Sequence, residues 1–236
     1  MFVACWSSKG GSGTTVVASG LALLLARSGP TLLADLAGDV PAVLGLPAAS
    51  GPGIAQWLAA EADVGPQRLA KLEVPVADNL SLLTRGSASA FEVAAAGVPR
   101  VDAGRTATLA ESLRQEAGQR SAADAADPGR QVVVDCGLLD RPEMIAVASA
   151  ADVGLLVLRP CFVALSRALQ LPIRPTGVIL VREPERALTQ RDVEDVLGVP
   201  VRARLDIDPS VSRAVDAGIL ARRMPRALER GLRGAA

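Results

Sequence analysis

The first 26 residues constrain the fold more than any other part of the sequence. Residues 2–6 are apolar and predict a buried strand, whereas residues 16–26 form a longer apolar run that predicts a helix. A glycine-rich turn lies between them, and this order is the context in which such a turn binds phosphate. Glycine lacks a Cβ, so its amide can approach an anion, and the helix N-terminus adds a partial positive charge. The sequence therefore predicts an anion-binding loop made by Gly10, Gly11, Ser12, Gly13 and Thr14.

The segment from Lys9 to Thr15, KGGSGTT, resembles the deviant Walker A loop, KGGxGK(S/T), of the ParA/MinD family of P-loop ATPases. Every fixed position is matched except one, because Thr14 stands where the family has its usual P-loop lysine. The TadZ/CpaE-like branch, whose members position Tad-type pilus secretion machines, often has Ser or Thr there, and the chain is most similar to this branch. The resemblance implies that ATP is the ligand and that the Thr15 hydroxyl binds Mg²⁺. An ordinary tight turn is the alternative.

Lys9 is distinguished by composition as well as by the motif. Among the 25 basic residues only Lys9 and Lys71 are lysines, and the others are arginines. A lysine in the loop of such a chain indicates that a compact point charge is needed there. In the family that the loop resembles, this lysine reaches across a face-to-face dimer to the partner's nucleotide. The resemblance thus implies that Lys9 is catalytic and that a homodimer forms on nucleotide binding.

Two acidic residues follow the next predicted strand, residues 31–35. Asp35 ends this apolar run, and the segment resembles the family's second acidic motif, DxDxQ or, in the TadZ/CpaE branch, DLDxxxGD. The second acid would fall at Ala37, so the chain departs from the pattern, and Asp39 is the candidate that replaces it as the catalytic acid. We expect Asp35 to contribute to the nucleotide site, and the alternative is a helix cap or turn residue.

A further apolar run, residues 131–135, resembles a Walker B strand. It ends in Asp135, whose carboxylate would hold the Mg²⁺ shell through water. Gly137 follows where the family has switch II, and the resemblance implies that its backbone amide approaches the γ-phosphate. An aspartate at a strand end is common by itself, so the interpretation depends on its distance behind the loop.

The remaining chain alternates predicted strands and helices, which indicates an α/β fold: a largely parallel sheet with helices on both faces. Ligands bind at the carboxyl ends of the strands in such sheets, so the loop, Asp35, Asp39 and Asp135 should share one edge. We expect a single domain, residues 1–236. Further strands are expected at residues 76–84, 153–158, 177–181 and 199–205, helices at 54–62 (with Trp57 in the core), 101–118, 164–171, 191–197, 210–217 and 226–233, and a surface loop at 119–130.

Composition limits the classes of function. A formal net charge of zero argues against bulk electrostatic binding of nucleic acid, and the absence of histidine excludes histidine acid/base chemistry. Cys5, Cys136 and Cys161 lack zinc-ligand spacing, and an odd number of cysteines without a signal peptide fits a reducing cytoplasm. An iron–sulfur reductase of the nitrogenase-iron-protein type shares the loop, but Cys136 and Cys161 do not match its cluster cysteines.

The C-terminal segment is basic and amphipathic, with apolar side chains at every fourth residue between Leu220 and Leu232. MinD-like proteins bind membranes through such a helix. Pro225 interrupts this one, and large aromatic anchors are missing. We therefore expect the last helix of the fold here, with membrane association as the alternative.

The residue at position 14 bears directly on activity. A P-loop lysine neutralises charge as the terminal phosphoryl group leaves. Thr14 offers a neutral hydrogen bond worth about 1 kcal/mol, against roughly 1.5 to 3 kcal/mol for a charge-assisted one. We expect an ATP-binding, dimerising positioning protein with weak or no hydrolysis. It would be cytoplasmic, recruited to a pole or septum by a protein partner in a secretion or division machine. The alternatives are an active ParA/MinD-type ATPase in partitioning or division-site selection, and a degenerate scaffold without nucleotide.

Overall fold

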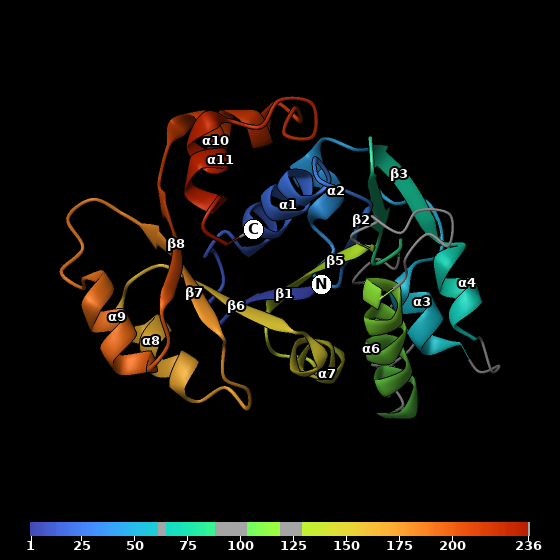
Figure 1. Ribbon diagram of the computed structural model, residues 1–236, viewed down its shortest axis with the longest axis horizontal. Coiled ribbons are helices and arrows are strands. Elements are labelled where there is room, and N and C mark those ends of the chain that lie inside the picture. Colours follow the sequence, from blue (N-terminus) through green and yellow to red (C-terminus); the bar gives the residue numbers. More distant parts are fainter. Residues whose placement is uncertain (61–64, 88–102, 119–128, 236) are drawn as a thin grey trace.

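One eight-stranded sheet organises the molecule (Figure 1). The computed structural model describes residues 1–60, 65–87, 103–118 and 129–235. Within these ranges the strand order is β3-β4-β2-β5-β1-β6-β7-β8, and all neighbouring strands are parallel except β3 and β4. The strands are β1 (Phe2–Ser7), β2 (Thr31–Asp35), β3 (Glu73–Ala77), β4 (Leu80–Leu83), β5 (Gln131–Leu138), β6 (Val153–Leu158), β7 (Gly177–Arg182) and β8 (Val201–Asp206).

Helices cover both faces of this sheet. The central strands are buried along almost their whole length, as parallel strands between two helical layers should be. One layer consists of α1 (Thr14–Leu25), α2 (Val40–Leu44), α10 (Pro209–Asp216) and α11 (Arg226–Leu232). The opposite layer consists of α3 (Ile54–Ala59), α4 (Pro66–Ala70), α6 (Ala103–Gly118), α7 (Pro142–Ala150), α8 (Phe162–Leu169) and α9 (Gln190–Leu197). The predicted α/β fold with a largely parallel sheet is confirmed.

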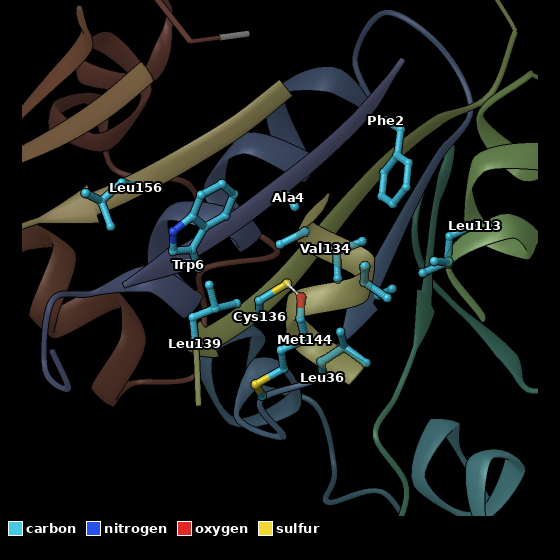
Figure 2. Packing of buried hydrophobic residues seen from close by; sticks show 14 of the residues in the cluster. Phe2, Ala4, Trp6, Leu36, Leu113, Val134, Cys136, Leu139, Met144 and Leu156 are labelled. Carbon is cyan, nitrogen blue, oxygen red and sulfur yellow. Dashed lines mark hydrogen bonds between the residues drawn. The ribbon is translucent and has the colours of Figure 1, made fainter. Parts of the chain in front are cut away.

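The central strand β1 contributes large side chains to the second layer (Figure 2). Phe2, Ala4 and Trp6 point to the same face because side chains alternate along a strand. The Trp6 ring lies directly over Gly154 of β6, where an added Cβ would be 2.4 Å from a ring carbon. A glycine is therefore needed for β6 to pass beneath the indole. Trp57 is also buried, which confirms its expected place in the core.

The last helix belongs to the fold, as predicted. Leu228 and Leu232 of α11 are buried in the layer that contains α1. They pack over Gly20 of α1, where an added Cβ would be 2.8 Å from the Leu232 side chain. No helix within the described residues is both long and apolar enough to cross a membrane.

The prediction of one strand over residues 76–84 is wrong. This stretch contains the end of β3, a turn at Asp78 and Asn79, and all of β4. Asn79 has a φ of 59°, a left-handed conformation that asparagine tolerates better than most residues. The chain reverses there, so β3 runs antiparallel at the sheet edge. Apolar residues on both sides of the turn produced a pattern that looked continuous.

Other predicted boundaries shift by a few residues. β5 continues to Leu138, three residues beyond its predicted end at 135, and α3 ends at Ala59 rather than at residue 62. The predicted helix 101–118 is observed from Ala103 onward. Residues 101–102 and 119–128 of the predicted helix and loop lie outside the described residues.

Candidate functional site: a glycine-rich loop near two buried carboxyl groups

The glycine-rich loop connects β1 to α1. Gly13 has a φ of 87°, a left-handed conformation that favours glycine, and α1 begins at the next residue, Thr14. The Ser12 hydroxyl donates a hydrogen bond to the Lys9 carbonyl at 2.7 Å, which closes the loop on itself. No side chain of the described residues caps the start of α1. The first amides of the helix are therefore available to an anion.

Asp35 is the last residue of β2 and is paired with Asp135, three residues before the end of β5; both are fully buried. The Asp35 carboxyl group accepts hydrogen bonds from the amides of Gly38 at 2.6 Å and Val40 at 3.2 Å. Burial raises the pKa of Asp35 to about 7; the Gly38 amide opposes this rise, and the charge of Asp135 adds to it. Asp35 thus holds the turn that carries Asp39, and a direct contact with nucleotide stays a prediction.

Only one of the two carboxyl oxygens of Asp135 has a hydrogen-bond partner among the described residues. Its Oδ1 accepts a hydrogen bond from the Gly137 amide at 2.9 Å. Its Oδ2 is buried without a hydrogen-bond partner among the described residues, although the Thr15 hydroxyl lies near enough to lower the Asp135 pKa. Burial outweighs Thr15 and the Gly137 amide and raises the pKa of Asp135 to about 6.

The Asp135 carboxyl group and the Thr15 hydroxyl fit a hydrated Mg²⁺. Mg²⁺ binds through one or two carboxylates, phosphate oxygens and retained waters rather than an all-protein cage. The described residues contain no cluster of three or more Cys, Asp or Glu side chains that could hold a metal. Asp135 and Thr15 could therefore supply only part of the coordination shell, and phosphate and water would complete it.

A cavity of about 620 Å³ opens between the loop and the ends of β2, β4 and β5. Of the residues predicted for the site, it is lined by Gly10, Gly11, Ser12, Gly13, Thr14, Thr15, Asp39 and Gly137. Asp35 and Asp135 lie buried at the same strand ends and do not line it. Lys9 is exposed and also lies outside the lining.

Gly137 brings two strand ends together at this cavity. Its φ is 57°, and an added Cβ would be 2.9 Å from the Cβ of Ala37. The Ser7 hydroxyl donates a hydrogen bond to the Gly137 carbonyl at 3.2 Å, which ties β5 to the start of the loop. The Gly137 amide donates to Asp135, so the predicted approach of this amide to a γ-phosphate stays a prediction.

A second cavity, of about 260 Å³, lies beside the first. The two cavities share Ser12, Gly13 and Val16 of the loop and the first turn of α1. Apolar side chains from β7, β8, α10 and α11 make up much of the wall: Val181, Leu205, Val211, Val215 and Leu228. A ligand could thus extend from the glycine loop into an apolar pocket.

Sequence reasoning missed this pocket and two arginines, Arg85 and Arg141, that line the first cavity. Arg85 lies just after β4, at a strand end that the prediction for residues 76–84 had placed almost correctly. Arg141 lies between β5 and α7, four residues after Gly137. Their positions at strand ends were a usable signal, but twenty-three arginines in the chain made these two inconspicuous.

No protein-family model matches the sequence, and no curated protein does. Solved structures match along nearly its whole length. The septum site-determining protein MinD from Pyrococcus horikoshii OT3, complexed with Mg-ADP, is 19% identical with a TM-score of 0.73, over 99% of this chain and 93% of that chain. A ParA family ATPase from Chlorobium tepidum TLS is 19% identical with a TM-score of 0.74, over 98% and 95%.

A third structure, the ATP complex of a variant of Cyanothece McdA, is 18% identical with a TM-score of 0.71, over 100% of this chain and 96% of that chain. At these identities the likeness concerns the fold. The chain therefore has the fold of the MinD/ParA P-loop ATPases.

Proposed function

We propose that the protein binds ATP together with Mg²⁺ at the carboxyl ends of β1, β2 and β5. The observation that carries this proposal is the unpartnered Oδ2 of Asp135 near the Thr15 hydroxyl, next to a glycine loop and an uncapped helix N-terminus. The loop amides would hold the phosphates, and Thr15 and Asp135 would hold the metal. Bound Mg²⁺ neutralises phosphate charge. MinD complexed with Mg-ADP and McdA complexed with ATP share the fold and support this proposal.

The apolar cavity beside the loop would bind the adenine base. It shares Ser12, Gly13 and Val16 with the first, larger cavity, so a nucleotide could extend through both cavities along the start of α1. Aliphatic walls from β7 and β8 suit the faces of a purine ring. This assignment gives a direction to the nucleotide: phosphates toward β2 and β5, base toward β8.

Hydrolysis would be slow or absent. Thr14 is buried at the first position of α1 and brings no charge to the phosphates. Binding depends on loop amides and metal, which remain, whereas turnover depends on neutralising the charge that develops as the phosphoryl group leaves. The loss should therefore affect catalysis more than affinity.

A second copy of the chain would close the site from outside. Lys9 is exposed, and its side chain has no hydrogen bond or ion pair with the described residues. Phe162 and Val163, at the start of α8, are 81% and 46% exposed. The Ser8 hydroxyl donates a hydrogen bond to the Ala164 carbonyl at 2.7 Å, so the start of α8 lies against the residue that precedes Lys9. An exposed aromatic and an exposed cation on this part of the surface suit a partner that presents the same face with its nucleotide.

We infer that nucleotide-dependent pairing serves positioning. Threonine at position 14 favours a TadZ/CpaE-like role, in which a cytoplasmic protein is recruited to a pole or septum and engages a secretion or division machine. Several proteins with this fold support such a role, including septum site-determining MinD and the MinC:MinD cell division complex from Aquifex aeolicus.

The test is a calorimetric titration of the purified protein with Mg-ATP, combined with a phosphate-release assay. We expect binding with turnover well below about 1 per second, the lower end for kinases. Thr14→Lys should tighten binding about tenfold, because a charge-assisted hydrogen bond is stronger by 1 to 2 kcal/mol. Failure to bind would overturn the proposal in favour of the scaffold, and turnover of about 1 to 100 per second would favour the active ATPase.

A further inference from the structure

Two arginines line the phosphate-loop cavity that Thr14 also lines. Arg85 follows β4, and Arg141 is the residue before α7. β4 and β5 lie on either side of β2 in the sheet, so the two side chains approach from both sides of the β2 end. Both are half-buried, and neither belongs to a phosphate-binding motif.

The backbone after β2 holds the two guanidinium groups side by side. Arg141 Nη2 donates a hydrogen bond to the Leu36 carbonyl at 2.6 Å. Arg85 Nη1 donates to the same carbonyl at 3.4 Å and to the Ala37 carbonyl at 3.3 Å. Burial lowers the pKa of Arg141, and the positive charge of Arg85 lowers it further. Two positive charges that contact the same carbonyl oxygen repel each other, and an anion between them would relieve that repulsion.

The protein itself compensates only one of these charges well. Arg141 forms an ion pair with Glu143 at 3.2 Å and lies 3.9 Å from Asp140. Arg85 has no carboxylate within 4.0 Å among the described residues, and its contacts are the two carbonyl oxygens. The cavity wall thus carries a cation whose counter-ion the described chain does not supply.

We propose that Arg85 and Arg141 bind the phosphates of the nucleotide and supply, for binding and within the same chain, part of the positive charge that Thr14 lacks. This inference rests on the proposed function, because it needs a nucleotide in the cavity. Guanidinium groups suit the task, since their planar donor fork matches phosphate oxygens and stays charged when half-buried. The glycine loop approaches the phosphates from the side of α1, and the arginines would approach from the ends of β4 and β5.

The experiment measures binding of Mg-ATP and of Mg-tripolyphosphate, which has the phosphates without the base, to wild type, Arg85→Ala and Arg141→Ala. We expect each variant to bind both ligands about tenfold more weakly, as loss of one charge-assisted hydrogen bond predicts. Arg114→Ala is the matched control, since Arg114 is an exposed arginine of α6 that pairs with Asp152 at 3.1 Å, away from the cavity. It should bind like wild type.

A rescue experiment distinguishes the loss of a positive charge from a loss of local structure. In the Arg85→Ala background, Thr14→Lys should restore most of the lost affinity, because both cations would serve the same phosphates. Thermal unfolding of each variant shows whether the fold is kept. Variants that bind like wild type, or a folded Arg85→Ala that Thr14→Lys does not restore, would overturn this inference while the proposed function stands. Wild type that binds neither ligand would overturn both.

Discussion

At the scale of single residues, the site depends on two carboxyl groups in unequal situations. Both oxygens of Asp35 are engaged by the turn after β2, whereas one buried oxygen of Asp135 has no hydrogen-bond partner among the described residues. The sequence predicted both residues, since each ends an apolar strand. It could not predict their different situations, because these depend on how the backbone at Gly38 and Gly137 folds back on each carboxyl group.

The role of Asp135 predicts a metal-dependent effect. Asp135→Ala should weaken Mg-ATP binding, because the metal loses its protein carboxylate, and should leave the much weaker metal-free binding almost unchanged. Titrations with and without excess EDTA measure the two values. Equal weakening in both conditions would mean that Asp135 only supports the strand end.

The buried carboxyl group of Asp35 predicts a dependence of stability on pH. Its folded-state pKa of about 7 lies above the ordinary value of 3.8, so the folded chain keeps a proton that the unfolded chain releases. The free energy of unfolding should then fall as pH rises from about 4 to about 7. Asp35→Asn removes this contribution, so its stability should fall less over that range. Urea unfolding without nucleotide, at pH 5 and pH 8, compares the two slopes, and identical slopes would contradict the expectation.

At the scale of elements, a short helix, α2, follows the turn after β2 that carries Asp39. α2 follows Asp39 directly and ends at Gly45, whose φ is 73°. A Cβ there would be 1.9 Å from the carbonyl oxygen of Gly218, just after α10. Two glycines thus let the segment after α10 pack closely against the C-terminal end of α2. Local sequence patterns could not predict the contact between Gly45 and Gly218, because these residues are far apart in sequence. They could not predict the β3–β4 hairpin either, because the turn at Asn79 lies within an apolar pattern.

This contact predicts a large cost for one methyl group. Gly45→Ala combines left-handed strain with a clash against rigid backbone, so we expect a loss of about 3 kcal/mol of unfolding free energy. Gly198→Ala is the matched control, because Gly198 has a similar φ of 67° but open space around it. It should lose only about 1 kcal/mol. Chemical denaturation of both variants gives the comparison, and equal losses would show that the backbone contact is unimportant.

At the scale of the whole molecule, the strand ends form one functional face. The two cavities beside the glycine loop, Lys9 and the exposed Phe162 all lie at the carboxyl ends of the parallel strands. The parallel sheet and the shared edge could be predicted from the alternation of strands and helices, whereas the order of the strands could not. The exposed aromatic could not, because an apolar residue at a helix start is normally expected in the core.

The proposed dimer predicts which exposed residues matter on this face. With a non-hydrolysable ATP analogue, wild type should sediment as a dimer, whereas Lys9→Ala and Phe162→Ser should stay monomeric and still bind nucleotide. Lys71→Ala and Leu169→Ser are the controls: Lys71 is the only other lysine, and Leu169 is 61% exposed at the far end of α8. Both controls should dimerise. A Lys9→Ala variant that dimerises normally would remove this residue from the interface.

The two outer strands have a consequence for how copies of the chain can combine. Pro75 in β3 lacks the amide proton that an added strand would need, and β8 turns the charged Arg202, Arg204 and Asp206 outward. Addition of a strand from another copy of the chain is therefore disfavoured at both edges of the sheet. The proposed association through the strand-end face would use that face once per subunit. Such a self-complementary contact closes under two-fold symmetry, so assembly would stop at a pair instead of growing into a filament.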